Sequence, residues 1–199
     1  MSRKILLAEI PKDLVKLRQK SEVVKNVDAD AKKLVAEMFE SMKADNGIGL
    51  SAPQIGALKR VIIAEYENDH TNSAAHSQAG KKDPLAASPS TAGGHDRGQA
   101  VLRTVLINPE IIWISKKEVL DEEGCLSFPN IYGMVKRPEK IRYKALDENG
   151  KEIKVKAEGL LARVIQHEID HLDGILLPDR VEGDLYTYEI RKDSESQAL

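Results

Sequence analysis

The chain has 199 residues, with 30 Lys and Arg against 32 Asp and Glu, which gives a formal net charge of −2. This length predicts one compact domain whose core is large enough to fold without disulfides. The near-neutral balance argues against a protein that binds nucleic acid by neutralising many phosphates. Its single cysteine, Cys125, cannot form an intramolecular disulfide, which fits a reducing compartment.

Membrane and export segments are not evident. No apolar run approaches the roughly 20 residues that a membrane-spanning helix requires. The N-terminal apolar stretch, residues 5–8, breaks at Glu9 and is too short for a signal peptide, and no transit peptide is evident. We therefore expect a cytoplasmic protein that contacts no membrane.

The first part of the chain predicts a helix, a loop and a strand. Apolar residues recur with a helical period over residues 28–44, with Asp28 as the expected N-cap and Gly47 as the expected terminator. This amphipathic helix should pack on the core. Residues 47–54 should form a glycine-containing loop and residues 61–64 a buried strand.

Residues 70–99 differ in composition from the rest of the chain. They contain no Val, Ile, Met or aromatic residue, so they cannot bury enough apolar surface to offset their ordering entropy. We expect them to be a flexible insertion within a single domain over residues 1–180. The irregular spacing of His70, His76 and His95 favours a solvated loop over a metal site.

The remainder predicts strands followed by one helix. Apolar stretches and apolar–polar alternation predict strands at residues 101–107, 111–114, 118–120, 141–145 and 153–157. Asn149-Gly150 favours a tight hairpin turn between the last two strands. A final helix is expected over about residues 160–173, ending at Gly174, and a polar C-terminal tail over residues 181–199.

That final helix contains the sequence His167-Glu168-Ile169-Asp170-His171. Residues four apart share a helix face, so both imidazoles can reach one metal ion while Glu168 projects beside them. The carboxylate can take and return the proton of a water that the metal activates. Apolar residues surround the two histidines and argue against a solvent-exposed pair. The pattern therefore predicts a metal site.

Two histidines do not complete a catalytic metal site, which usually has three protein ligands and one open position. The candidates for the third ligand are Cys125 upstream and a carboxylate such as Glu189 downstream. Glu189 would make the chain a zinc endopeptidase, although mostly polar residues remain after the helix to build a cleft. The other alternative is a non-catalytic module in which a metal ion only stabilises the fold, but structural metal sites favour four protein ligands.

Three motifs in order make the chain resemble the peptide deformylases, which remove the formyl group from nascent chains. They are Gly-Ile-Gly-Leu-Ser-Ala-Pro-Gln at 47–54, Glu-Gly-Cys-Leu-Ser at 123–127 and Gln-His-Glu-Ile-Asp-His at 166–171. The similarity covers residues 5–66 and 101–180. It implies an α+β fold with mostly antiparallel sheets packed around a central metal-binding helix, together with an amphipathic N-terminal helix.

The resemblance also implies the chemistry of the site. One divalent metal ion would be held by Cys125, His167 and His171, with Glu168 as the catalytic acid and base. The family implies Fe²⁺ as the native ion, whereas Zn²⁺, Ni²⁺ and Co²⁺ also suit these donors. The expected partners are nascent peptides that begin with N-formyl-methionine, with transient ribosome contact and no direct nucleic-acid site.

Further residues are expected around this centre. The resemblance implies that the side-chain amide of Gln54 and the backbone N–H of Leu126 donate hydrogen bonds to the oxyanion that forms in the reaction. The expected substrate-binding residues are Ile48, Gly49, Gly124, Leu160, Arg163 and Val164. Gly49 would let an extended substrate backbone approach, the three aliphatic residues would hold the methionine side chain, and Arg163 would cover the rim by its aliphatic stem.

Glu123 and Arg137 are expected to pair and to brace the cysteine segment, although an exposed ion pair of little energetic value is the alternative. Two features depart from the family. Ser51 stands where the family most often has alanine, and residues 70–99 form a longer insertion than expected.

Overall fold

The structure is a computed structural model that describes residues 2–68 and 100–188. The predicted insertion at residues 70–99 therefore lies outside the described residues, as does the end of the expected tail. The same holds for His70, His76 and His95, which were expected in a solvated loop, and for the candidate ligand Glu189.

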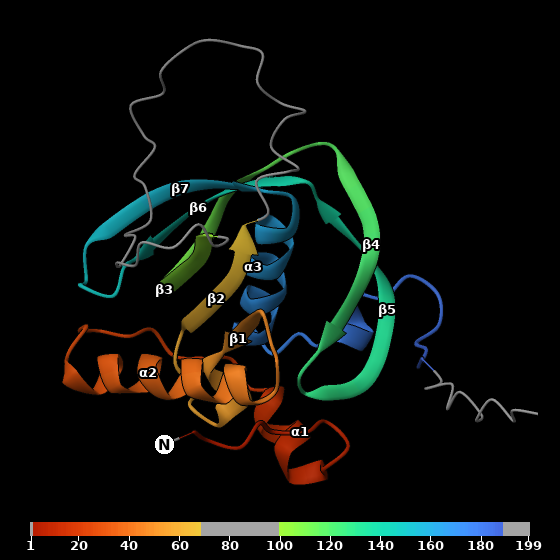
Figure 1. The fold of residues 1–199 in the computed structure, drawn as a ribbon, viewed down its shortest axis with the longest axis horizontal. Helices are drawn as coiled ribbons and strands as arrows, with labels where there is room; N and C mark the ends of the chain where they lie inside the picture. Colours follow the sequence, from red (N-terminus) through yellow and green to blue (C-terminus); the bar gives the residue numbers. More distant parts are fainter. Residues whose placement is uncertain (1, 69–99, 189–199) are drawn as a thin grey trace, which may run out of the picture.

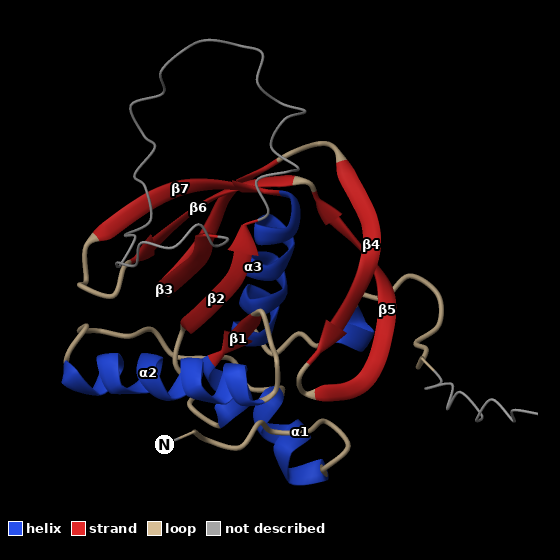
Figure 2. Cartoon of the chain, in the orientation of Figure 1, coloured by secondary structure: helices blue, strands red, loops and turns tan. Residues whose placement is uncertain are grey.

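The described residues form an α+β fold with two antiparallel sheets (Figure 1, Figure 2). The larger sheet has the order β1-β2-β3-β6-β7 and the smaller sheet is the β4–β5 hairpin. Every pairing within these sheets is antiparallel, as expected. The strands are β1 (Gly49–Ser51), β2 (Val61–Asn68), β3 (Ala100–Ile114), β4 (Glu118–Cys125), β5 (Phe128–Pro138), β6 (Lys140–Leu146) and β7 (Glu152–Glu158).

Helix α3 (Gly159–Leu172) stands between the two sheets and contacts strands of both (Figure 1). Its apolar side chains Ala162, Ile165 and Leu172 are fully buried in the core of the larger sheet. The helix ends before Gly174, whose φ of 75° is accessible to glycine without steric cost. The predicted central helix is thereby confirmed to within one residue at each end.

Helix α2 (Ala29–Ala44) confirms the predicted amphipathic helix and its cap. The Asp28 side chain accepts a hydrogen bond from the Ala31 backbone N–H at 3.0 Å, and the apolar face is buried against β1 and β2. The expected terminator is wrong by one position, because Asn46 adopts the left-handed conformation, with φ 52°. Asparagine tolerates this region better than most residues.

The structure differs from the sequence-based prediction around the first motif, residues 47–54. Part of the expected loop at 47–54 is strand β1, which pairs with β2, and a 3-10 helix, Ala52–Ile55, follows it. A short helix α1 (Pro11–Leu17) and strand β5 were not predicted. Proline, asparagine and glycine interrupt the β5 sequence, but its pairing with β4 supplies the backbone hydrogen bonds.

Elsewhere the strand predictions hold with longer bounds. The two segments expected at 101–107 and 111–114 form the single irregular strand β3. The β6–β7 hairpin is confirmed, with Gly150 at φ 80° in its turn. No helix in the described part of the chain is long and apolar enough to cross a membrane.

Residues 181–188 differ from the polar tail expected there, because they contact the smaller sheet. Val181 forms a bridge with Val135, and Tyr186 forms a bridge with Tyr132. A side chain at Gly133 would collide with Val181, at 2.3 Å from the position of a Cβ atom. Because Gly133 has no side chain, Val181 can pack closely against β5.

Candidate metal centre

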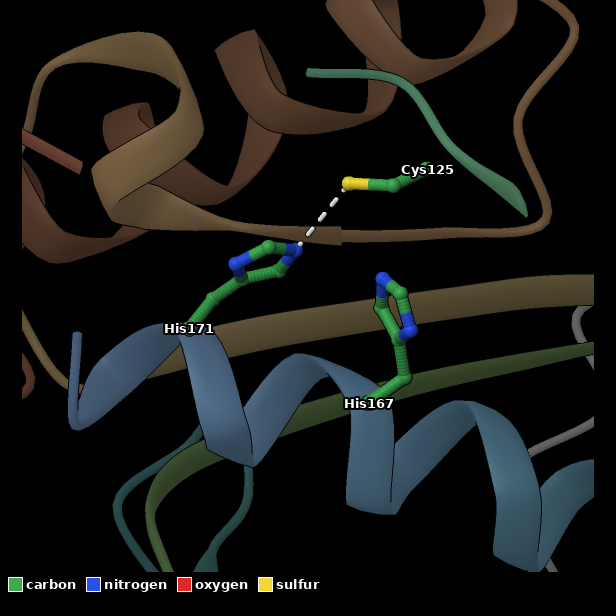
Figure 3. Close-up of side chains that lie close together, drawn as sticks. All are labelled: Cys125, His167 and His171. Carbon is green, nitrogen blue, oxygen red and sulfur yellow. Dashed lines mark hydrogen bonds between the residues drawn. The ribbon is translucent and has the colours of Figure 1, made fainter. Parts of the chain in front are cut away.

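Cys125, His167 and His171 converge where the end of β4 approaches α3 (Figure 3). The two imidazoles project from one face of α3 toward the cysteine side chain. Their candidate ligand atoms all lie within 4.8 Å of one another, and Cys125 Sγ is 3.2 Å from His171 Nε2. Ligand atoms around a four-coordinate ion lie about 3.5 Å apart, given bonds of about 2.0–2.3 Å. The donor set therefore fits one divalent metal ion.

Glu123 orients one of these imidazoles. His167 Nδ1 lies 2.9 Å from Glu123 Oε2, so an Nδ1–H that donates to the carboxylate leaves Nε2 free to ligate. Burial alone would raise the pKa of Glu123, but hydrogen bonds from His167 and Arg137 hold it well below its usual range. The carboxylate is therefore charged at neutral pH and favours the required tautomer.

The predicted ion pair between Glu123 and Arg137 is present and buried. Arg137 Nε and Nη2 donate to the two Glu123 oxygens at 2.7 and 2.9 Å, and Arg137 Nη1 donates to Asp170 Oδ2 at 2.8 Å. The exposed alternative is excluded, because the two side chains are only 7% and 5% exposed. Removing one partner of such a buried pair typically costs about 3–5 kcal/mol.

Arg163 has a different environment from the expected pocket rim. Although it lines the cleft described below, its guanidinium donates to Glu123 Oε1 at 2.7 Å. It also donates to the backbone carbonyls of Val135 and Val119, at 2.9 and 2.8 Å. The Arg163 guanidinium is thus hydrogen-bonded to acceptors on β4 and β5. Its role is therefore to hold Glu123 in place. The sequence could not indicate this, because two of the acceptors are backbone atoms.

Gln54 lies beside the three candidate ligands, buried at the end of the first motif. Its Oε1 accepts hydrogen bonds from the backbone N–H and the hydroxyl of Ser51, at 2.9 and 2.8 Å. Its Nε2 faces Cys125 Sγ at 3.6 Å and Ser127 Oγ at 3.3 Å. The structure thus turns the amide N–H groups toward the centre. Sequence reasoning did not identify either serine as part of it.

Glu168 is buried next to Gly49. A Cβ atom on Gly49 would lie 2.7 Å from both Glu168 Oε1 and Val164 Cγ1, so glycine is required for close packing against α3. Within the described residues, Glu168 Oε2 has no hydrogen-bond partner. Burial raises the pKa of Glu168 to about 7, against smaller opposing effects of His167 and Ser51. A carboxyl group with this pKa can both accept and donate a proton near neutral pH.

A cleft of about 710 Å³ opens beside the centre. Gln54, Leu126 and Glu168 line it. So do all six predicted substrate-binding residues: Ile48, Gly49, Gly124, Leu160, Arg163 and Val164. Ile48 and Leu160 are 45% and 52% exposed, so they are not ordinary core residues. The cleft thus offers apolar side chains next to a polar centre, the combination that small-ligand sites use.

Comparisons with known proteins indicate the family to which the chain is related. The sequence profile described as Polypeptide deformylase matches residues 3–185. The peptide deformylase of Thermodesulfovibrio yellowstonii is 44% identical over 165 residues, which cover 83% of this chain and 82% of that protein.

Solved structures give the same result. The crystal structure of a probable peptide deformylase from Synechococcus phage S-SSM7 matches with a TM-score of 0.70 and 37% identity, over 90% of this chain and 99% of that one. The peptide deformylase of Ehrlichia chaffeensis in complex with actinonin has a TM-score of 0.70 and 34% identity, over 92% and 90% of the two chains. The chain therefore belongs to the polypeptide deformylase family, the metal-dependent hydrolases that remove the N-formyl group from nascent polypeptides.

Proposed function

We propose that deformylation takes place in this chain at a metal ion held by Cys125, His167 and His171, with Glu168 as the acid–base residue. The observation that carries this proposal is the convergence of the three donor atoms beside a buried carboxylate. The test is formate release from a short formyl-methionine peptide, measured with the metal content of anaerobically purified protein. Metal-loaded protein that releases no formate would contradict it.

We propose Fe²⁺ as the native ion. One thiolate and two imidazoles suit several divalent ions, and intrinsic affinity favours zinc over iron, so the choice rests on the resemblance to the family. Protein purified without oxygen should contain iron and should lose activity on exposure to air. Full activity of protein that contains only zinc, alongside an inactive iron form, would exclude this assignment.

Glu168 would move the proton in this reaction. A bound divalent ion would supply Lewis acidity, which can lower the pKa of a water molecule from about 15.7 to about 7. Glu168 accepts a proton from the attacking water and returns it to the departing amine nitrogen as the C–N bond breaks. Its raised pKa and its proximity to both histidines support this role.

Gln54 and Leu126 would stabilise the negative charge that develops on the formyl oxygen. The Gln54 amide presents its N–H groups beside Cys125, and the backbone N–H of Leu126 directly follows that residue. Donors that are already oriented need no reorganisation when the charge appears. The methionine side chain of the substrate would lie against Ile48, Leu160 and Val164.

Replacing Gln54 by alanine should therefore lower kcat by about 10²–10³, the usual cost of losing one oxyanion donor. Metal content should remain stoichiometric, because the three proposed ligands are untouched. Single-turnover deformylation with metal analysis of the same preparation measures both quantities. Parental kcat in this variant would remove Gln54 from the mechanism.

We propose that the chain works in the cytoplasm, in transient contact with the ribosome. The proposal rests on the substrate class, because formylated N-termini arise as nascent chains leave the ribosome. Co-sedimentation with ribosomes at low salt tests the contact. Equal recovery of the protein with and without ribosomes would contradict it.

We propose that residues 70–99 are a dispensable insertion within one catalytic domain. The segment is bounded by strands that pair, since Asn68 lies opposite Ala100 at the end of the β2–β3 ladder. A short Gly-Ser turn can therefore replace residues 70–99, because the entropy of loop closure changes slowly with length. We expect metal content and formate release within a few-fold of the parent. A folded variant that has lost either would place the segment in the site.

A further inference from the structure

Ser51 occupies a fully buried position beside Gln54. It ends β1 and precedes the 3-10 helix that carries Gln54, and its side chain is 0% exposed. The resembled family most often has alanine here, so the hydroxyl is a feature of this chain that the general mechanism does not require.

The hydrogen bonds around Ser51 determine which way the Gln54 amide faces. A backbone N–H can only donate, so the Gln54 atom 2.9 Å from the Ser51 nitrogen must be the amide oxygen. Nε2 must then lie on the opposite side, toward Cys125 and Ser127. This orientation follows from the donors themselves.

The hydroxyl of Ser51 adds a second constraint. Its own hydrogen is donated to Gln54 Oε1 at 2.8 Å. Both acceptor sites of Oε1 are thus occupied, whereas alanine would leave only the backbone donor.

Two donors on the amide oxygen affect its nitrogen. Linked hydrogen bonds polarise one another, which makes the Nε2–H groups stronger donors. They also hold the amide plane fixed, which matters because donors to a developing oxyanion are most effective when oriented in advance.

We propose that Ser51 is a positioning residue for deformylation, whose hydroxyl orients and polarises the Gln54 amide toward the formyl oxygen. The inference rests on the proposed role of Gln54 and deepens it. Ser51 acts through Gln54 and does not touch the substrate.

The test compares Ser51→Ala and Ser51→Cys in zinc-loaded protein. Cysteine nearly keeps the volume of serine but is a weak hydrogen-bond donor. Both variants should lose about 3- to 10-fold in kcat, as expected for one hydrogen bond, with KM and metal content unchanged. Parental kcat in both variants would overturn the proposal.

Ser41→Ala is the matched control. Ser41 is also a buried serine, but it lies on α2, where its hydroxyl donates to the Glu37 carbonyl at 2.9 Å and accepts from the Arg3 backbone N–H at 2.8 Å. Ser41→Ala should lower the melting temperature and leave kcat unchanged. An equal loss of kcat in Ser41→Ala would show that any buried serine has this effect, which would overturn the specific role of Ser51.

A double-mutant cycle separates positioning from an independent role. In the Gln54→Ala background, Ser51→Ala should cause no further loss of kcat, because the group it acts through is gone. Equal losses in both backgrounds would overturn the proposal. Parental activity of Gln54→Ala alone would instead refute the proposed oxyanion role.

The side-chain amide resonances of Gln54 give a readout that does not depend on turnover. In the ¹H–¹⁵N spectrum of zinc-loaded protein, Ser51→Ala should shift these two resonances and Ser41→Ala should not. Unchanged Gln54 resonances in Ser51→Ala would show that the hydroxyl does not control the amide.

Discussion

Cys125→Ala should yield folded protein without a stoichiometric metal ion and without formate release. The same result is expected for His167→Ala and His171→Ala. A catalytic centre with three protein ligands has no spare donor, so the loss of any one leaves too few to retain the ion. Metal analysis after gel filtration and the formate assay measure the two losses.

Of these three substitutions, Cys125→Ala is the most informative test of the proposed centre. The Cys125 thiol comes from β4, whereas both imidazoles come from α3, so only the fold brings it to them. It lies 3.2 Å from His171 Nε2, and the other candidate third ligand, Glu189, lies outside the described residues. Glu189→Ala should leave metal content unchanged and serves as the control. A full metal complement in Cys125→Ala would remove the proposed centre.

The metal-binding helix was predictable from the sequence because its information is local. His167 and His171 are four residues apart, and helical geometry alone places them on one face with Glu168 beside them. The structure brings both imidazoles together as that spacing requires. The helical period of the local sequence is therefore enough to predict that both imidazoles lie on the same side of the helix.

The third ligand was not predictable in the same way. Spacing left Cys125 and Glu189 as alternatives, because the contact between β4 and α3 joins segments more than forty residues apart. The resemblance to a family, and not the local pattern, indicated Cys125. The structure then placed its sulfur beside both imidazoles.

Contacts with backbone atoms were the hardest to foresee. Arg163 donates to the backbone carbonyls of Val119 and Val135. A pattern of side chains in the sequence cannot predict backbone acceptors of this kind. Strand β5 was missed for a related reason, since it is stabilised by pairing with β4 despite proline and glycine in its sequence. In β5, long-range backbone pairing outweighed local propensity.

Glu168→Gln should retain the metal ion and lose about 10²–10⁴ of turnover, the usual contribution of general acid–base catalysis. Glutamine keeps the size of the side chain, so the packing against Gly49 is preserved. It cannot take the proton of water, and no other buried carboxylate oxygen of the cleft lacks a hydrogen-bond partner among the described residues.

Glu123→Gln provides the contrast that separates proton transfer from metal binding. Glu123 acts on the ion through His167 Nδ1, at 2.9 Å, so this variant should lose about 10- to 100-fold in metal affinity. Competition with a chelator measures that affinity, and presteady-state formate release at saturating metal measures the chemical step. Glu168→Gln should change only the second quantity. If Glu168→Gln instead lost the metal, or released formate at the parental rate, Glu168 would not be the acid–base residue.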